Sequence, residues 1–278
     1  MDMDNLQINL TGKRALVTGG NTGIGAGIVE SLASAGARVV INYIRKPELA
    51  QAMVDEINQA RGEGTALAVE ADISREDEVA KLFSSAKEAF GGLDILVNNA
   101  GVEDMYPALD MPMSEWDRIL GVNLRGTFMC SKAAALMMKE QGTGGVIINN
   151  SSIHDVVPRL GATHYCVSKA GVTMLTKVLA LEWGEYGIRV VGVSPGAIDS
   201  HRDWDPIPRA ARRLVTKISF KKWVPLQRVG EVEEVANAVA FLASDYASYI
   251  TGTTLYIDGA YSINVVRYDP RRFFRPQK

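Results

Sequence analysis

Cysteine is almost absent from this chain, and its scarcity excludes two classes of protein. Only Cys130 and Cys166 occur among the 278 residues, and neither belongs to a CxxC motif. A disulfide framework and a structural zinc site both need more thiols at short spacings. The three histidines, at positions 154, 164 and 201, lack metal-ligand spacing as well. We therefore expect no metal site, and we interpret Cys166 as a small buried residue rather than a nucleophile.

Long hydrophobic runs and a strong excess of charge are also missing. No apolar run approaches the roughly 18 residues that span a bilayer. The N-terminal Met1-Asp2-Met3-Asp4 is acidic and lacks a signal-peptide core. The formal net charge of −2 argues against general affinity for nucleic acid or membranes. The absence of a GxxxxGK[ST] motif disfavours a nucleotide-triphosphate P-loop. We expect a cytoplasmic protein that binds neither nucleic acid nor membrane.

What the chain contains is an alternation of short apolar runs with longer amphipathic ones. Its 47% hydrophobic content suffices for a large core, and no linker or repeat divides it, so we expect one domain over 1–278. The alternation predicts an α/β, doubly wound Rossmann fold with a seven-stranded parallel sheet flanked by helices. The expected strands are 14–18, 38–42, 65–70, 94–98, 146–151, 189–194 and 254–258. The expected helices are 24–35, 47–61, 76–90, 114–140, 164–183 and 231–243.

Several polar or small residues follow directly after these expected strands. In a doubly wound sheet, ligands bind outside the carboxyl ends of the strands. The residues in question are Gly19, Asp72, Asn99, Ser152 and Pro195. We therefore expect them to converge on one edge of the sheet and to form one binding cleft there.

A glycine-rich turn follows the first expected strand. The segment Thr18-Gly19-Gly20-Asn21-Thr22-Gly23-Ile24-Gly25 has a GxxxGxG spacing and is followed at once by an amphipathic run. Glycines allow a tight strand-to-helix turn and close approach of the backbone to a pyrophosphate at the helix N-terminus. A purely structural turn is the alternative interpretation.

Tyr165 and Lys169 are the most informative pair in the sequence. On a helix covering 164–183, residues four apart share a face, so the phenol and the ammonium point into the same cleft. A free phenol has a pKa of about 10 and is a poor acid or base at neutral pH. A nearby cation favours the phenolate and brings the pKa towards the working range. Ser152 would then hold the substrate oxygen that exchanges a proton with Tyr165. An exposed pair on a helix is the alternative.

These motifs, taken in order, resemble those of the short-chain dehydrogenase/reductase family. The motifs are TGGNTGIG, the NNAG at Asn98–Gly101, Asn123, Ser152, Tyr165-x-x-x-Lys169 and Pro195-Gly196. The match runs from about residue 10 to 260. Within the family the chain looks most like bacterial glucose 1-dehydrogenases. This finer resemblance lies in Asn42-Tyr43, in Gly101-Val102-Glu103 and in the segments 150–158 and 194–198.

The resemblance implies an oxidoreductase that transfers hydride between a nicotinamide cofactor and a secondary alcohol or carbonyl. Tyr165 would be the general acid or base, Ser152 would hold the substrate, and Lys169 would bind the nicotinamide ribose. Asn123 would lie at a helix kink and complete a water relay, the alternative being a plain exposed Asn. The implied cofactor-binding residues are Gly19, Asn21, Thr22, Gly23, Ile24, Gly25, Tyr43, Arg45, Lys46, Asp72, Ile73, Asn99, Ala100, Gly101, Tyr165, Lys169, Pro195, Gly196 and Ile198.

The choice between NAD and NADP rests on the end of the second expected strand. A carboxylate there would bind the ribose 2′-hydroxyl and select NAD, but none occurs before Glu48. Arg45 and Lys46 could neutralise a 2′-phosphate. Ile44 stands where the glucose dehydrogenases usually have arginine, which weakens NADP specificity. We expect NADP to be accepted, with NAD as a second cofactor.

The substrate is inferred from a few polar residues near the open end of the expected cleft. Glu103, His154 and Asp155, together with Ser152, could hydrogen-bond several hydroxyls of a sugar or polyol. A loop-capping role for His154 is the alternative. The family's substrate lid, about 199–225 here, is rich in basic residues, which suits either a solvated helix face or recruitment of an anionic substrate. A 3-oxoacyl-carrier-protein reductase is the second hypothesis, and a noncatalytic nucleotide-binding scaffold is the third.

The C-terminal extension, residues 261–278, continues past the point where family members commonly end. Its segment 267–276 contains three aromatics and four arginines. Because Phe273 and Phe274 would be costly to expose and family members form tetramers, we expect this tail to pack across a subunit interface of a homotetramer. A disordered basic end is the alternative.

Overall fold

The computed structural model describes residues 7–200, 220 and 223–264. Within these ranges a seven-stranded sheet has the order β3-β2-β1-β4-β5-β6-β9. Every neighbouring pair of strands is parallel. The strands are β1 (Arg14–Val17), β2 (Arg38–Tyr43), β3 (Ala66–Glu70), β4 (Ile95–Asn98), β5 (Gly145–Asn150), β6 (Ile188–Pro195) and β9 (Thr254–Ile257). The seven expected strands and the parallel, doubly wound sheet are confirmed.

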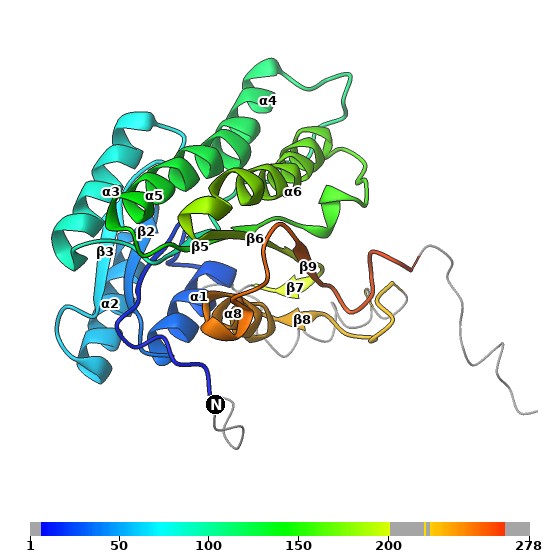
Figure 1. Cartoon of the computed structure of the whole chain (residues 1–278). Coiled ribbons are helices and arrows are strands. Elements are labelled where there is room, and N and C mark those ends of the chain that lie inside the picture. The colour runs from blue at the N-terminus through cyan, green and yellow to red at the C-terminus, as the bar shows by residue number, and fades with distance from the viewer. Residues whose placement is uncertain (1–6, 201–219, 221–222, 265–278) are drawn as a thin grey trace, which may run out of the picture.

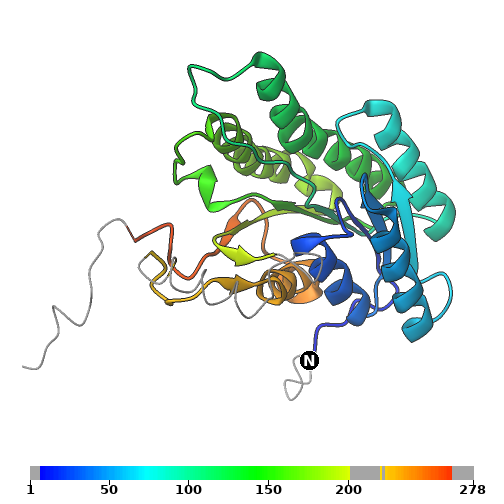
Figure 2. The same cartoon turned by 180° about the vertical axis from the view of Figure 1, so that it is seen from behind.

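Helices cover both faces of this sheet (Figure 1). One face carries α1 (Gly23–Ser34), α2 (Pro47–Arg61) and α8 (Val232–Ala243). The other face carries α3 (Glu76–Phe90), α5 (Thr127–Gln141) and α6 (Thr163–Trp183), and Figure 2 shows the same arrangement from behind. The expected helix over 114–140 is divided: α4 (Met113–Leu120) continues through a π-helical segment, Gly121–Gly126, into α5.

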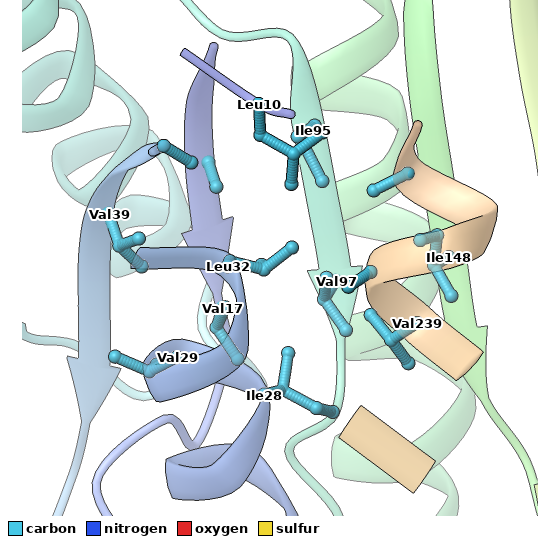
Figure 3. Packing of buried hydrophobic residues seen from close by; sticks show 14 of the residues in the cluster. Leu10, Val17, Ile28, Val29, Leu32, Val39, Ile95, Val97, Ile148 and Val239 are labelled. Atoms are coloured by element: carbon cyan, nitrogen blue, oxygen red, sulfur yellow. The ribbon is translucent and has the colours of Figure 1, made fainter. Parts of the chain in front are cut away.

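Alternate strand residues divide the core into two layers. Val17 and Ile41 face the cluster formed with α1, α2 and α8. Leu16 and Val40 face the cluster formed with α3, α5 and α6. This period of two explains why the strands, buried on both faces, read as continuous apolar runs in the sequence. Figure 3 shows the first cluster, with Ile28, Val29 and Leu32 of α1 packed against Val17, Val39, Val97 and Val239.

A second, two-stranded sheet was not expected from the sequence. It pairs β7 (Ile198–Asp199) with β8 (Gly230–Glu231) in parallel. Strands of two residues are too short to show the alternation that reveals a strand. Between them lies most of the basic segment about 199–225, of which 201–219 and 221–222 are outside the described residues. The aromatic and basic part of the C-terminal extension, 265–278, is outside them too.

The described part of the chain contains neither a membrane-spanning helix nor a metal-binding cluster. No helix in these ranges is long and apolar enough to cross a bilayer. No group of three or more His, Cys, Asp or Glu side chains there is arranged to hold a metal ion. Burial raises the pKa of the Cys130 thiol to about 12, so this cysteine stays protonated at neutral pH.

Helices α1 and α8 pack against each other at Gly27. A Cβ at Gly27 would overlap Cγ1 of Val232, a buried side chain at the start of α8. We therefore expect Gly27→Ala to lower the free energy of unfolding by about 1–3 kcal/mol, the usual range for overpacking. Thermal and denaturant unfolding would measure the change.

Gly184→Ala is the matched control for this prediction. Gly184 has helical angles (φ −59°, ψ −35°), and a Cβ there would have nothing within 4 Å. This substitution should be neutral or stabilise the protein by up to about 1 kcal/mol. Equal losses in the two variants would contradict the packing argument.

Candidate active site

The four side chains expected to act in catalysis lie close together at the carboxyl edge of the sheet. Ser152 follows β5, while Tyr165 and Lys169 lie in the first turns of α6. Asn123 comes from the π-helical segment before α5. A Cβ on Gly101 would lie 3.5 Å from Oδ1 of Asn123 and 3.6 Å from Nζ of Lys169, which places both groups beside the same loop.

Ser152 and Tyr165 form a hydrogen-bonded pair. Ser152 is extended (φ −169°, ψ 157°) and begins a short 3₁₀ turn, Ile153–Asp155, in which its Oγ accepts a hydrogen bond from the His154 N–H at 3.2 Å. Burial raises the pKa of Tyr165 to about 12, and the hydrogen bond with Ser152 opposes this rise. The pKa is thus raised rather than lowered, contrary to the effect expected from Lys169, because burial is the largest cause of the shift. The Lys169 ammonium lies 5.7 Å from the centre of the phenol ring.

Lys169 is buried beneath this pair. Its Nζ donates a hydrogen bond to the carbonyl oxygen of Asn150 at 2.8 Å. Burial lowers the pKa of Lys169 to about 8, while the charges of Asp155 and Glu103 oppose the decrease. A pKa of about 8 leaves the ammonium form in the majority at neutral pH.

Asn123 is fully buried, so the alternative of a plain exposed Asn is wrong. Its Oδ1 accepts from the Val102 N–H at 2.8 Å, and its Nδ2 donates to the Val102 carbonyl at 2.9 Å. Nδ2 also donates to Oγ of Ser168 at 3.1 Å. These bonds fix the loop after β4 to the helix that carries Tyr165 and Lys169. The π-helical segment turns the Asn side chain inward, since π-bulges interrupt the regular helical phase.

The glycine-rich turn has the geometry that a pyrophosphate needs. Gly19 and Gly23 adopt left-handed angles, with φ of +58° and +54°. A Cβ on Gly25 would overlap the Gly19 carbonyl and lie 2.5 Å from Nδ2 of Asn99, so only glycine fits there. The Thr22 side chain makes no capping hydrogen bond at the start of α1. The N-terminus of this helix is thus suited to bind a phosphate group.

A chain of side-chain amides connects this turn to β5. Nδ2 of Asn99 donates to the carbonyls of Thr18 and Gly19, both at 3.0 Å. Oδ1 of Asn99 accepts from Nδ2 of Asn150 at 3.0 Å. Oγ1 of Thr18 accepts from the N–H groups of Asn99 and Ala100, both at 3.0 Å. The glycine turn and the carbonyl that holds Lys169 are therefore parts of one hydrogen-bonded network.

Thr18, Asn42 and Asn150 were missed by the sequence analysis as parts of this site. Asn42, in β2, accepts from the Gly19 N–H at 3.2 Å and donates to the Ala71 carbonyl at 2.9 Å. All three are buried polar residues at or near the carboxyl ends of strands that are otherwise apolar. A buried polar group needs a hydrogen-bond partner. A polar residue at the end of an apolar strand was therefore the signal in the sequence that could have identified these three residues.

The expected cofactor residues after β2 lie next to the glycine turn. Nδ2 of Asn21 donates to the carbonyls of Arg45 and Lys46, at 2.7 and 3.1 Å. Tyr43 ends β2, and Lys46 has left-handed backbone angles (φ 59°, ψ 58°) at the start of α2. The backbone of this segment is thereby held beside the glycine turn.

Asp72 and Ile73, after β3, are held by local contacts. Oδ1 of Asp72 accepts from the N–H and the hydroxyl of Ser74, at 2.9 and 2.7 Å. Arg75 occupies the N-terminal cap position of α3 and makes no side-chain capping hydrogen bond. Ile73 is buried against Gly126, where a Cβ would lie 2.9 Å from the Ile73 carbonyl.

The segment after β6 also lies next to the glycine turn. Pro195 ends the strand, and the Gly196 N–H donates to the Ile257 carbonyl at 3.0 Å. Ile198 begins β7, and the carbonyl of Ser200 would lie 3.3 Å from a Cβ on Gly23. The cofactor residues expected after β6 thus adjoin those expected after β1.

The three residues expected to contact substrate differ in their surroundings. Glu103 forms an exposed ion pair with Arg159. Nδ1 of His154 lies 2.9 Å from the Val157 carbonyl, and its ring meets that of Tyr165 edge to face at 6.2 Å. The Asp155 carboxylate instead accepts hydrogen bonds from three protein hydroxyls at 3.2 Å or less. Glu103 and His154 remain near the catalytic pair, whereas Asp155 is engaged within the protein.

Comparison with known proteins places this arrangement among nucleotide-dependent oxidoreductases. A family model described as "Enoyl-(Acyl carrier protein) reductase" matches residues 19–262. The chain is 42% identical over 259 residues to "3beta-hydroxysteroid dehydrogenase 1" of Eggerthella lenta, covering 92% of this chain and 95% of that protein. It is 39% identical over 258 residues to "Glucose 1-dehydrogenase 2" of Bacillus subtilis, covering 92% and 96%. A solved short-chain type dehydrogenase/reductase from Mycobacterium marinum has a TM-score of 0.81 and 36% identity, covering 92% of this chain and 97% of that one.

The amide chain predicts a specific effect of Asn99→Ala on dinucleotide binding. The variant loses three side-chain hydrogen bonds that hold the glycine turn and β5 together. Each neutral hydrogen bond contributes about 0.5–1.5 kcal/mol, so we expect the Kd for NADH and NADPH to rise by about 10-fold or more. Fluorescence titration with the reduced dinucleotides would measure it.

Asn98→Ala provides the control from the neighbouring residue. Nδ2 of Asn98 donates to Oγ of Ser131 and Oδ1 of Asn149, away from the glycine turn. This variant should lower the unfolding temperature and leave the dinucleotide Kd within a factor of about two, since no bond to the turn is lost. Equal increases in Kd for both variants would show that the effect is only a general loss of stability.

Proposed function

This chain belongs to the short-chain dehydrogenase/reductase family and is an NAD(P)-dependent oxidoreductase, and we propose that it acts on a secondary alcohol of a sugar or polyol. One observation carries the proposed chemistry. A half-buried tyrosine is hydrogen-bonded to a serine, with a lysine ammonium 5.7 Å from the centre of the phenol ring, beside a glycine turn suited to a pyrophosphate. A noncatalytic scaffold would have no need of Asn123, Ser152, Tyr165 and Lys169 together.

The cofactor would be held by residues from five strand ends. The turn Gly19–Gly25 would bind the pyrophosphate, the segment Tyr43–Lys46 the adenosine ribose, and Asp72-Ile73 the adenine. Pro195, Gly196 and Ile198 would adjoin the nicotinamide end, near Asn99, Ala100 and Gly101. When bound, the nicotinamide ring supplies the hydride chemistry, and the protein orients the reactants. The absence of a carboxylate at the end of β2 supports use of NADP, with NAD as a second cofactor.

The protein's own groups would perform the proton transfer. Ser152 Oγ and the Tyr165 hydroxyl would both bind the substrate hydroxyl, and in the oxidative direction Tyr165 would take its proton. Because burial raises the pKa of Tyr165 to about 12, the phenolate needs stabilisation. Ser152 would provide it by hydrogen bonding, and Lys169 would add its positive charge together with that of the bound nicotinamide ring. Asn123 would hold a water that passes the proton from Lys169 to solvent.

Polar groups near the catalytic pair support a sugar or polyol. Glu103 and Arg159 form a charged pair there, and the imidazole of His154 lies against Tyr165. Several hydroxyls of one substrate could be satisfied by these groups. A 3-oxoacyl-carrier-protein reductase is the alternative. The description of the matched family model also names an acyl carrier protein, and the basic composition of 202–222 suits an acidic carrier.

We also propose that the chain forms one catalytic domain and assembles as a homotetramer. Apolar side chains are exposed along the outer faces of α5 and α6, where a second copy would cover them. They are Phe128, Leu136, Val167, Met174, Val178 and Leu181.

A substrate panel tests the proposed function directly. Aldoses, polyols and 3β-hydroxysteroids would be assayed with NAD and NADP, and 3-oxoacyl thioesters with NADH and NADPH, by absorbance of the reduced nicotinamide. We expect the highest kcat/KM for an aldose or polyol, because only these substrates satisfy the polar groups near Tyr165, and we expect NADP to be accepted. A higher value for a 3-oxoacyl thioester would favour the alternative, and turnover of none of the classes would contradict both.

Tyr165→Phe tests the role of the phenol. Loss of a general acid or base typically costs about 10²–10⁴ in rate, and we expect kcat to fall by that factor while the Kd for the dinucleotide changes little. Tyr186→Phe is the control, since Tyr186 lies after α6 against the Lys139 ammonium and its ring is retained. A Tyr165→Phe variant with more than about half of the wild-type turnover would overturn the assignment.

A further inference from the structure

The Asp155 carboxylate is bound by hydroxyl groups from three other elements. Its Oδ2 accepts from Oγ1 of Thr173 in α6 at 2.6 Å and from Oγ of Ser194 in β6 at 2.9 Å. Its Oδ1 accepts from the hydroxyl of Tyr256 in β9 at 3.2 Å. All three donors are neutral hydroxyl groups.

These bonds fix the turn that carries Ser152. Asp155 ends the 3₁₀ turn that Ser152 begins, and Ser152 Oγ already binds the His154 N–H within that turn. Anchoring Asp155 to α6, β6 and β9 therefore restrains the position of Ser152 relative to Tyr165, which lies on the same helix as Thr173.

Ser151 extends the contact to the backbone of Lys169. Its Oγ donates to the Lys169 carbonyl at 3.0 Å and lies 3.2 Å from Oγ1 of Thr173. It also lies 3.5 Å from Oδ2 of Asp155. The carboxylate thus belongs to the hydrogen-bonded network around the helical turn that begins at Lys169.

The charge of Asp155 acts on the Lys169 ammonium. Burial lowers the pKa of Lys169 to about 8, and Asp155 is the first of the two carboxylates that oppose this decrease, Glu103 being the second. The other titratable groups around Asp155 are Tyr256, His154 and Asp258. Burial raises the pKa of Tyr256 to about 12, with the charges of Asp155 and Asp258 adding to it, so this phenol remains a neutral donor through the range of an assay.

We propose that Asp155 is a positioning residue for the catalytic pair rather than a substrate contact, because its hydrogen bonds hold the turn of Ser152 against α6. The charge of Asp155 also favours the ammonium form of Lys169. The inference rests on the proposed function of Tyr165 and Lys169. It reassigns Asp155 from the substrate-binding group expected from the sequence, because protein hydroxyls bind both carboxylate oxygens.

Asp155→Asn tests the proposal, since it preserves shape and removes the charge. Misplacement of a reacting group costs up to about 10²-fold in rate, and we expect kcat to fall within that range. Without the carboxylate, Lys169 loses its proton at lower pH. The alkaline limb of the kcat profile should therefore move to lower pH, and so should the alkaline loss of NADPH affinity measured by fluorescence titration.

Two controls separate this role from a general loss of stability. Asp94 accepts hydrogen bonds from the N–H, Nε and Nη2 of Arg14, all at 2.8 Å, before β4 at the opposite edge of the sheet. Asp94→Asn should lower the unfolding temperature without moving either alkaline limb. Asp155→Glu restores the charge and should return both limbs towards their wild-type positions, even if kcat stays low.

The outcomes distinguish this proposal from the proposed function. An Asp155→Asn enzyme with wild-type kcat and unmoved alkaline limbs would overturn the positioning role. Equal movement of the limbs in Asp94→Asn would overturn it as well. If the wild-type enzyme binds NADPH but turns over no substrate in the panel, the proposed function fails. The fluorescence titration alone then tests the role of Asp155. If Asp155→Asn loses NADPH affinity at the same alkaline pH as the wild type, the inference is rejected.

Discussion

The hydrogen bond from Nζ of Lys169 to the carbonyl of Asn150, 2.8 Å long, connects the two halves of the site. It joins helix α6 to the end of β5, and the side chain of the same Asn150 holds Asn99 and, through it, the glycine turn. A buried ammonium requires such a partner, since an unpaired charge in the core costs several kcal/mol. The position of Lys169 and the shape of the glycine turn therefore depend on one residue at a strand end.

Neutral amides and hydroxyls, rather than ion pairs, organise the centre of the sheet. Asn98 donates to Asn149, and Asn149 donates to Oγ1 of Thr176 in α6, so neighbouring strands and a helix are joined through buried polar side chains. The ion pair Glu103–Arg159, by contrast, lies in an exposed position and contributes little to stability. Neutral bonds in a dry interior provide orientation without the desolvation cost of a charge.

The alternation of strands and helices was predictable because each element is indicated by the residues of its own segment. Buried strands read as apolar runs, and the helices over 47–61 and 76–90 have the expected bounds. The parallel topology placed Ser152 at the carboxyl edge of the sheet, and the four-residue spacing of Tyr165 and Lys169 placed both on one face of a helix. The pKa of Tyr165 could not be predicted, because desolvation depends on how the surrounding chain packs. The inward bonding of Asp155 was equally hidden, since its donors come from β6, β9 and α6, far apart in sequence.

The amide chain at Asn99 has a consequence for the chemical ageing of the protein. Deamidation would replace the donating Nδ2 by an oxygen that faces the carbonyl oxygens of Thr18 and Gly19, so the damaged residue would repel the turn that it now holds. Deamidation proceeds by attack of the following backbone nitrogen on the side-chain amide. That nitrogen belongs to Ala100, and its N–H is held by Oγ1 of Thr18 at 3.0 Å. The bond to Thr18 therefore restrains the attacking atom, and the folded protein slows this covalent damage beside the glycine turn.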